Sequence, residues 1–302
     1  MLHGLTWLGP AVLAMVVGAP PRAADPGRTT VRVRAVDSMA QVRVPAGEFV
    51  MGTTSHADAR DNEKPRHAVY LDGYWIDRTP VTNAMFARFV KAARYKTDAE
   101  QAGSGYAFNP ESQNWEELRG TDWRHPRGPS SSVEATGDHP VVQVTWADAA
   151  AYCRWAGARL PTEAEWEKAA RGTDERDYPW GDAEVSGDRV NFADRNLNVS
   201  WANTSIDDGY AFTAPVAGHP AGLSPYGVLG MAGNVWQWLA DWYDAGYYVH
   251  SPRRNPAGPP SGEFRVARGG AWGGAVRDLR AWHRGWGPPG MRADGQGFRC
   301  AE

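Results

Sequence analysis

The residues of this chain that could do chemistry are dispersed rather than grouped. Its 302 residues include eight His and two Cys. The His residues form no i, i+4 pair and no readable spacing for a facial triad, so the sequence gives no positive support for a redox-metal site. It also contains no Gly-x-Ser-x-Gly elbow, no Walker loop and no dinucleotide fingerprint. The common motifs of serine hydrolysis and nucleotide binding are therefore absent.

One segment near the C-terminus holds several candidates for a binding pocket. His283 lies between Arg280 and Arg284, and these arginines could bind an anionic ligand or pair with carboxylates. A lone His in such a place is more often a hydrogen-bonded wall residue than a reactive group. Trp236 and Trp272 could line a groove, although a core role is common in a chain with 15 Trp. The pocket candidates are Trp236, Trp272, His283 and Arg284.

The elements that must position these residues are predicted to be short. The 34 Gly and 22 Pro indicate tight, irregular turns between aromatic packing points. Short strands are predicted near residues 42–44, 49–51, 68–71 and 264–267, where apolar residues alternate or cluster. Residues 97–139 lack periodicity, and we expect a long loop or an insertion packed by Trp115 and Trp123.

Three helices are predicted from their N-terminal capping residues. Thr82, Thr145 and Thr162 each precede a segment with helical spacing of its apolar residues. Thr162 and Glu165 have the spacing of a capping box, and Gly172 is well placed to end the third helix.

The first 24 residues are expected to be a signal peptide. The segment 5–19 is mostly apolar but too short to span a bilayer comfortably, and small residues up to Ala24 could precede a cleavage site. The alternative is a mildly apolar N-terminus. Residues 25–41 are polar and rich in Arg, so we expect a linker there and a folded domain over 42–302. These features predict a periplasmic or secreted protein with no membrane span in its mature form.

The charge distribution argues against a nucleic-acid partner. The formal net charge is −3 at pH 7, and Lys and Arg are scattered along the chain. No basic stripe of the kind that neutralises phosphates is present. Length alone allows one or two domains, and we expect one.

A series of short motifs runs through most of the chain. They lie at residues 44–52, 139–146, 151–153, 159–167, 170–172, 178–181, 233–238, 268–270 and 297–300. In composition and order, they resemble the formylglycine-generating enzyme (sulfatase-modifying factor) family over roughly residues 42–302. The resemblance implies a loop-rich, single-domain α+β protein with that family's variant of the C-type lectin fold.

The resemblance breaks at the family's catalytic loop. In catalytic members, an Arg-Gly-Gly segment is followed by a serine, an aromatic residue and two cysteines five residues apart, whose thiolates bind copper(I). Here Ala271 stands at the serine position, and residues 273–279 contain no sulfur. We therefore expect no copper and no conversion of a sulfatase cysteine to formylglycine.

The two cysteines of the chain match other positions of the family. Cys153 and Cys300 correspond to a bridged pair, and an even cysteine count in an exported chain favours pairing, so a disulfide is predicted. The alternative is two buried free thiols.

The resemblance also implies a calcium site. Asn191 and Asp208 match its side-chain ligands, and Phe192 and Tyr210 match residues that supply backbone carbonyls. The segment 207–209 could instead form an ordinary solvated turn.

A second calcium site is expected to be weak. Gly230 stands where the family has an asparagine, and Gln237 stands where it has a glutamate. Only the carbonyls of Gly233 and Val235 remain comparable, so a full negative charge is missing.

These observations favour an exported accessory, maturation or ligand-binding factor with an unknown polypeptide or small-molecule client. The alternative is a tailoring oxidoreductase of the family with non-cysteine chemistry. Cysteine-less relatives, such as the one required for pyoverdine chromophore maturation, look like periplasmic maturation factors. A purely structural role ranks third, because the motif at 233–238 persists.

Overall fold

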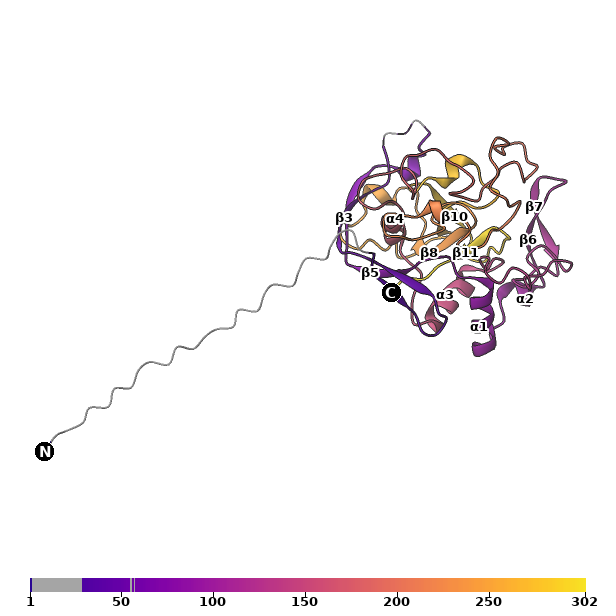
Figure 1. Cartoon of the computed structure of the whole chain (residues 1–302), viewed down its shortest axis with the longest axis horizontal. Coiled ribbons are helices and arrows are strands. Elements are labelled where there is room, and N and C mark those ends of the chain that lie inside the picture. The colour runs from indigo at the N-terminus through magenta and orange to yellow at the C-terminus, as the bar shows by residue number, and fades with distance from the viewer. Residues whose placement is uncertain (2–28, 55, 57) are drawn as a thin grey trace.

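The computed structural model describes Met1 and residues 29–302 with the exception of residues 55 and 57. The predicted signal peptide, apart from Met1, lies outside the described residues. The helices are α1 (Asn83–Ala93), α2 (Asp98–Ala102), α3 (Trp146–Trp155) and α4 (Glu163–Arg171), with short 3-10 turns η1 (Asp61–Glu63), η2 (Pro220–Gly222), η3 (Tyr247–Val249) and η4 (Val276–Leu279). The strands are β1 (Val31–Val33), β2 (Ala40–Val44), β3 (Gly47–Met51), β4 (His67–Leu71), β5 (Tyr74–Asp77), β6 (Ser104–Asn109), β7 (Asn114–Arg119), β8 (Trp236–Trp242), β9 (Arg265–Arg268), β10 (Arg284–Gly287) and β11 (Gln296–Phe298) (Figure 1).

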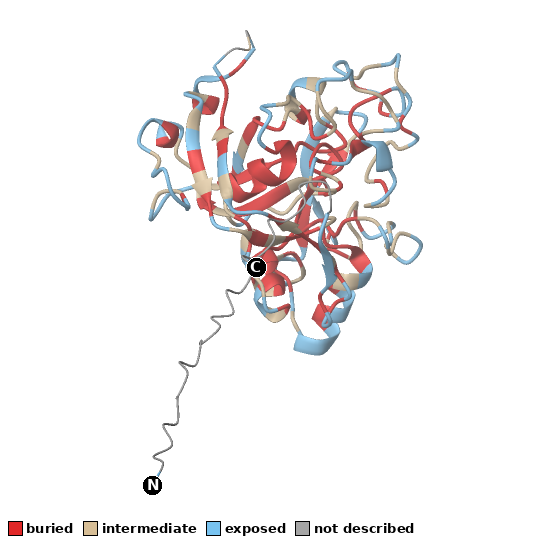
Figure 2. Ribbon diagram, turned by 60° about the vertical axis from the view of Figure 1, so that its left-hand side comes forward, coloured by how far each residue is buried: buried red, intermediate tan, exposed pale blue. Residues whose placement is uncertain are grey.

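The strands form small sheets around α4. One sheet has the order β1-β2-β5 and another the order β10-β9-β8-β11, while β3–β4 and β6–β7 are two-stranded. Every pair is antiparallel except β8–β11, which is parallel. α4 contacts β3, β4, β8 and β9, and Figure 2 shows it as a buried helix. The architecture is thus mixed α/β, rich in small sheets and irregular segments.

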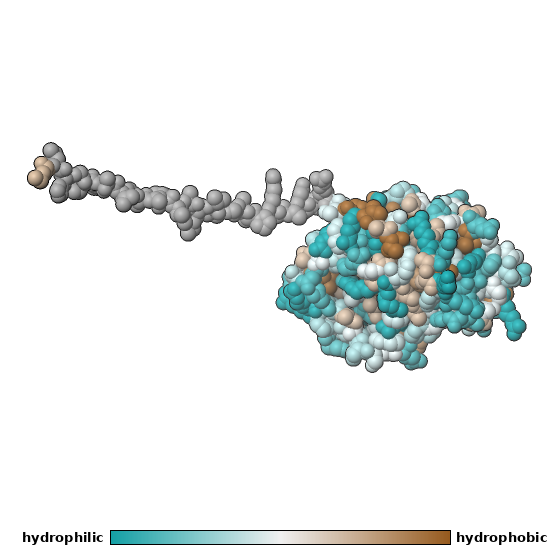
Figure 3. All heavy atoms as spheres, turned by 90° about the horizontal axis from the view of Figure 1, so that it is seen from below, coloured by the Kyte–Doolittle hydropathy of each residue, from teal (hydrophilic) through white to brown (hydrophobic). Residues whose placement is uncertain are grey.

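Among the described residues, four apolar clusters fill the interior, and two of them are large. One surrounds Trp166 of α4, and the other packs Phe86 of α1 against Tyr152 of α3 and Phe298 of β11. Figure 3 shows that hydrophilic residues cover most of the face it presents, where hydrophobic residues form separate patches. In the described part of the chain, no helix has the length and apolar character needed to cross a bilayer.

The three predicted helices are confirmed, together with their capping residues. Thr82 accepts a hydrogen bond from the backbone N–H of Met85, and Thr145 and Thr162 each take part in a capping box. α4 ends at Gly172, whose N–H donates to the carbonyl of Lys168. Local capping therefore fixes the ends of the helices that carry much of the core.

Residues 97–139 are not a loop throughout: their first half is regular, and residues 120–139 contain no helix or strand. They contain α2 and the hairpin β6–β7, and β6 docks onto the C-terminal region through the N–H of Tyr106, which donates to the carbonyl of Arg292. Trp123 is buried as expected, but Trp115 is 40% exposed. β7 is exposed along its whole length, so the hairpin lacks the apolar alternation by which a half-buried strand is recognised.

Residues 31–41 are also part of the fold, so the predicted linker is wrong there. Val31 of β1 lies opposite Val42 of β2. Arg34 is buried, with its Nη1 2.9 Å from Asp77 Oδ1 and its Nη2 2.6 Å from Asp37 Oδ2. The polar residues that suggested a linker instead contribute to an internal ion cluster. Their burial is tolerated because the charge of Arg34 is paired with those of Asp37 and Asp77.

The C-terminus closes the fold beside these first strands. The N–H of Asp77 donates to the carbonyl of Cys300, and the N–H of Trp75 donates to that of Glu302. Cys300 forms the predicted disulfide with Cys153 of α3, and both residues are fully buried. Closing this loop of 147 residues contributes about 5 kcal/mol to stability in the chain-entropy model.

We predict that Arg34→Ala lowers the unfolding free energy by about 3 to 5 kcal/mol, because it leaves two buried carboxylates without their cation. Arg32→Ala is the matched control: the Arg32 side chain is 40% exposed and pairs with Glu302 at the surface, so the expected loss is below about 1 kcal/mol. Urea denaturation of both variants measures the difference. Equal losses would show that residues 31–41 are not anchored through Arg34.

Candidate functional site

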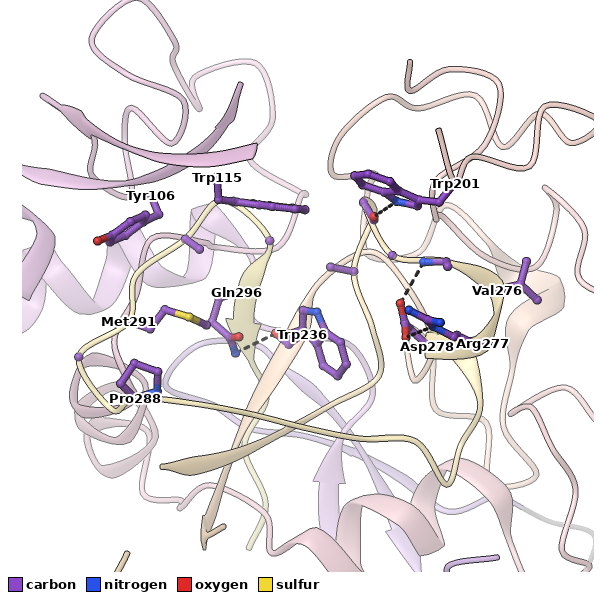
Figure 4. A pocket seen from close by; sticks show the side chains of 17 residues that line it. Tyr106, Trp115, Trp201, Trp236, Val276, Arg277, Asp278, Pro288, Met291 and Gln296 are labelled. Carbon is purple, nitrogen blue, oxygen red and sulfur yellow. Dashed lines mark hydrogen bonds and ion pairs between the residues drawn. The ribbon is translucent and has the colours of Figure 1, made fainter. Parts of the chain in front are cut away.

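A cavity of about 1040 Å³ lies beside residues 273–278, where the resemblance implies cysteines that this chain lacks. Its aromatic walls are Tyr106, Trp115, Trp201 and Trp236, and residues 273–278 and 288–296 supply most of the remaining lining. Figure 4 shows Trp115 and Trp201 on opposite sides, with Trp236 between Gln296 and Asp278. Segments far apart in the sequence thus converge on one largely apolar cavity.

A buried ion cluster holds both ends of the segment 268–284. Arg284 makes a bidentate pair with Glu163 of α4, with Nε to Oε1 at 2.7 Å and Nη2 to Oε2 at 2.9 Å. Arg268 donates to Glu163 Oε1 at 3.0 Å and to Glu167. Burial of Glu163 would by itself raise the pKa of its carboxyl. The two arginines outweigh this effect and hold that pKa below its usual range. Arg284, a predicted pocket residue, is therefore a structural cation and does not line the cavity.

The segment between these arginines needs glycine at its start. Gly270 has φ +75°, and a Cβ there would lie 2.8 Å from the carbonyl oxygen of Asp278. The segment then turns into η4, where the carboxylate of Asp278 accepts a hydrogen bond from the N–H of Ala275 at 3.0 Å. Close backbone approach, not phosphate binding, accounts for this glycine.

The aromatic walls are held by hydrogen bonds from their indoles. Trp201 Nε1 donates to the carbonyl of Gly273 and Trp115 Nε1 to Asp294 Oδ1, each at 3.0 Å. Burial raises the pKa of Asp294 to about 6. Trp272, another predicted pocket residue, is 1% exposed and donates to the carbonyl of Asp294. It packs beneath the wall, so of the two predicted tryptophans only Trp236 lines the cavity.

His283 lies behind the cavity wall. Its Nδ1 is 2.7 Å from Glu63 Oε1, and its Nε2 is 3.5 Å from Oδ1 of Asp278, which does line the cavity. His283 is 4% exposed. Its burial and its contact with Glu63 agree with the expectation that it is a hydrogen-bonded residue of the pocket wall. Arg280 pairs with Asp58, so the two arginines beside His283 both engage carboxylates.

Sequence reasoning missed Tyr106, Trp201, Asp278 and Gln296. Tyr106 belongs to the unrecognised hairpin, and Trp201 lies in a segment without helix or strand. No motif or periodicity marks either residue. Their exposure in an aromatic-rich chain becomes informative only once the tertiary structure brings them together.

The cavity does not fit a copper(I) centre of the family's kind. Both cysteine sulfurs are joined in the disulfide, and the lining contains one sulfur, the neutral thioether of Met291. A single thioether does not replace two thiolates. Within the described ranges, no three His, Cys, Asp or Glu side chains are grouped to hold a metal ion.

The residues expected at the first calcium site suit a hard cation. Asn191 is 1% exposed, and its Oδ1 accepts no hydrogen bond from any described residue. Its Nδ2 is used, since it donates to the carbonyl of Phe212 at 2.8 Å. Asp208 is buried and accepts from the N–H groups of Phe192 and Tyr210. An orphaned amide oxygen and a buried carboxylate are oxygen donors of the kind that calcium prefers.

The residues expected at the weak second site do not suit calcium. Gln237 Oε1 already accepts from Trp166 Nε1 at 2.9 Å and from Arg299 Nε at 2.6 Å. The carbonyl of Gly230 accepts from Gln237 Nε2 and Arg299 Nη2, while that of Gly233 accepts from the N–H of Val235. A buried guanidinium thus supplies positive charge here, and a divalent cation would meet its repulsion.

We predict that calorimetry finds one calcium ion per chain and that Asp208→Ala abolishes its binding. Asp207→Ala is the matched control, because Asp207 is exposed in the same turn and its Oδ1 accepts from the N–H of Gly209. Calcium should raise the Tm of the wild type and of Asp207→Ala but not that of Asp208→Ala. Two tight calcium ions, or unchanged binding by Asp208→Ala, would contradict the assignment.

Comparisons with known proteins agree with the motifs. A sequence model of the sulfatase-modifying factor enzyme 1-like domain matches residues 28–302. The formylglycine-generating enzyme of Streptomyces coelicolor is 40% identical over an alignment of 309 positions, and the alignment covers 96% of each chain. The Mus musculus protein named inactive C-alpha-formylglycine-generating enzyme 2 is 36% identical over 287 residues, which cover 87% of this chain and 85% of the mouse chain.

A solved structure supports the same relationship. PvdO from Pseudomonas aeruginosa aligns with a TM-score of 0.72 and 27% identity over 92% of this chain and 99% of that chain. The chain belongs to the sulfatase-modifying factor (formylglycine-generating enzyme) family.

Proposed function

We propose that this chain binds a polypeptide or small-molecule client in the aromatic cavity without converting it to formylglycine, and so acts as an accessory or maturation factor. One observation carries the proposal. The cavity remains open and is walled by residues 273–278, yet that wall contains no sulfur. The cavity is present, although its wall lacks the cysteines that bind copper(I) in catalytic members of the family.

The relatives are compatible with a non-catalytic role. One protein that is 36% identical over most of the chain carries the word inactive in its name. A large, mostly apolar cavity with few polar groups is the usual form of a small-ligand or peptide side-chain site. These facts favour recognition over oxidation at this position.

The location and fold we assign follow from the same family. We propose export to the periplasm or beyond, supported by the apolar segment at residues 5–19 and by a disulfide, which persists in oxidising compartments. The architecture we assign is the family's variant of the C-type lectin fold. The pairing of Ile76 with Ala301, which brings the first sheet to the C-terminus, supports this assignment.

A second candidate is a tailoring enzyme with acid–base chemistry. The observation in its favour is the sequence of contacts from Glu63 through His283 to Asp278 at the cavity wall. An imidazole held between carboxylates can move a proton to a bound ligand. This candidate requires turnover of a client, whereas the first requires only binding.

We predict that a sulfatase-motif peptide incubated with the purified protein, copper(I), reductant and oxygen keeps its thiol and its mass. Calorimetry should detect binding of the same peptide, and Trp201→Ala should weaken it about tenfold, because aromatic contact area in the cavity is lost. Trp286→Ala is the matched control: Trp286 is 44% exposed, against 40% for Trp201, but stacks on Tyr243 away from the lining.

Formation of an aldehyde at a rate near that of a cysteine-containing relative would overturn the proposal. Equal loss of binding in the two tryptophan variants would place the client elsewhere. Binding that depends on Trp201 but not on Trp286 supports the cavity as the site.

A further inference from the structure

The inner part of the cavity offers hydrogen-bond acceptors that the protein leaves unused. Gln296 is 1% exposed and lines the cavity, and its Oε1 accepts no hydrogen bond from the described residues. The orientation of this amide is set by its nitrogen, since Nε2 donates to the carbonyls of Trp236 at 3.3 Å and Gly297 at 3.4 Å. A buried acceptor without a donor is costly, so a ligand that supplies a donor there gains affinity.

The carboxylate of Asp278 lies across the Trp236 ring from Gln296 (Figure 4). Figure 4 shows the Trp236 indole between the Gln296 amide and the Asp278 carboxylate, with Trp115 and Trp201 above. Asp278 Oδ2 accepts from Ala275 N, while Oδ1 faces His283 Nε2 at 3.5 Å and Arg277 Nε at 3.6 Å. Neither contact of Oδ1 is a close hydrogen bond, so this oxygen can accept one from a ligand.

The charges around Asp278 leave room for a cation. His283 is paired with the buried carboxylate of Glu63 at 2.7 Å. The side chain of Arg277 is 68% exposed and is free to move into solvent, so its loose pairing contributes little. The inner cavity then presents one carboxylate, one free amide oxygen and aromatic faces.

We propose that this cavity selects a cationic nitrogen group that carries N–H donors, a guanidinium or an ammonium on an apolar stem. The inference rests on the proposed binding function and names the class of group bound. The cation lies against the face of Trp236, which attracts it electrostatically, while its N–H groups reach Asp278 on one side and Gln296 on the other. The source of the group is either a free amine or a basic side chain of a polypeptide, and both present the same chemistry.

The test compares N-acetyl-arginine methylamide with N-acetyl-citrulline methylamide, which has nearly the same shape but no charge. Calorimetry with the full chain should give about tenfold tighter binding of the arginine compound. Agmatine and a short peptide with a central arginine distinguish the two sources: a tighter peptide indicates a polypeptide client, and a tighter agmatine indicates a free amine. Either preference supports the cation site.

Three variants separate charge from hydrogen bonding. Asp278→Asn keeps an oxygen for the N–H of Ala275 and should remove most of the preference for arginine over citrulline. Arg277→Ala removes the competing cation and should tighten arginine binding a few-fold. Gln296→Met should weaken both compounds by a similar few-fold factor. Glu184→Gln, at an exposed carboxylate outside the lining, is the control and should change nothing.

Circular dichroism and Tm establish that each variant is folded before binding is measured. Equal affinity for arginine and citrulline, or tighter binding of N-acetyl-glutamate methylamide, would overturn the inference while leaving a binding cavity in place. If none of these compounds binds and the sulfatase-motif peptide also fails to bind, the proposed function fails with it. An arginine preference that Asp278→Asn leaves intact would equally refute the assigned geometry.

Discussion

The arrangement of the cavity depends on one buried carboxylate, that of Glu163 in the first turn of α4. It is shared by Arg268 at the end of β9 and Arg284 at the start of β10, with contacts between 2.7 and 3.0 Å. Two buried guanidiniums around one carboxylate are tolerable because Arg268 also binds Glu167 and because Arg284 donates to the carbonyl of Asn62. Removing one partner of such a cluster leaves uncompensated buried charge. The two arginines are therefore held in place, and they fix both ends of the segment between them.

The contacts of Glu163 with the two arginines hold the segment between them without any cysteine. The conformation of residues 269–283 is set by the arginines, by the close approach at Gly270 and by hydrogen bonds such as Trp201 to the carbonyl of Gly273. None of these contacts uses a cysteine. The absence of thiolates therefore changes what the wall can react with, but leaves the walls of the cavity in place. Under the proposed function, recognition and reactivity are separable because different residues supply them.

The features predictable from sequence are those set by local chemistry or by family motifs. The threonine caps of α1, α3 and α4 follow from local hydrogen bonding, and the Cys153–Cys300 pair follows from the resemblance. The hairpin β6–β7 and the buried Arg34 could not be predicted. An exposed strand lacks the alternation of apolar and polar residues that marks a half-buried strand. A segment whose arginine becomes enclosed by carboxylates is as polar in composition as a linker. Trp236 was named as a tryptophan that could line a groove, whereas Trp201 and Gln296 gain their roles only from tertiary contacts.

Amide hydrogen exchange over residues 271–278 tests most directly whether the cavity wall is formed before any ligand arrives. We expect slow exchange in the unliganded protein, since the N–H groups of Trp272, Gly274 and Asp278 are hydrogen-bonded to backbone carbonyls. In Glu163→Gln, which keeps the shape of the side chain and removes its charge, protection should fall across residues 268–284 while α1 stays protected. Fast exchange of this segment in the wild type, or unchanged protection in Glu163→Gln, would show that the Glu163 cluster does not hold a preformed cavity wall.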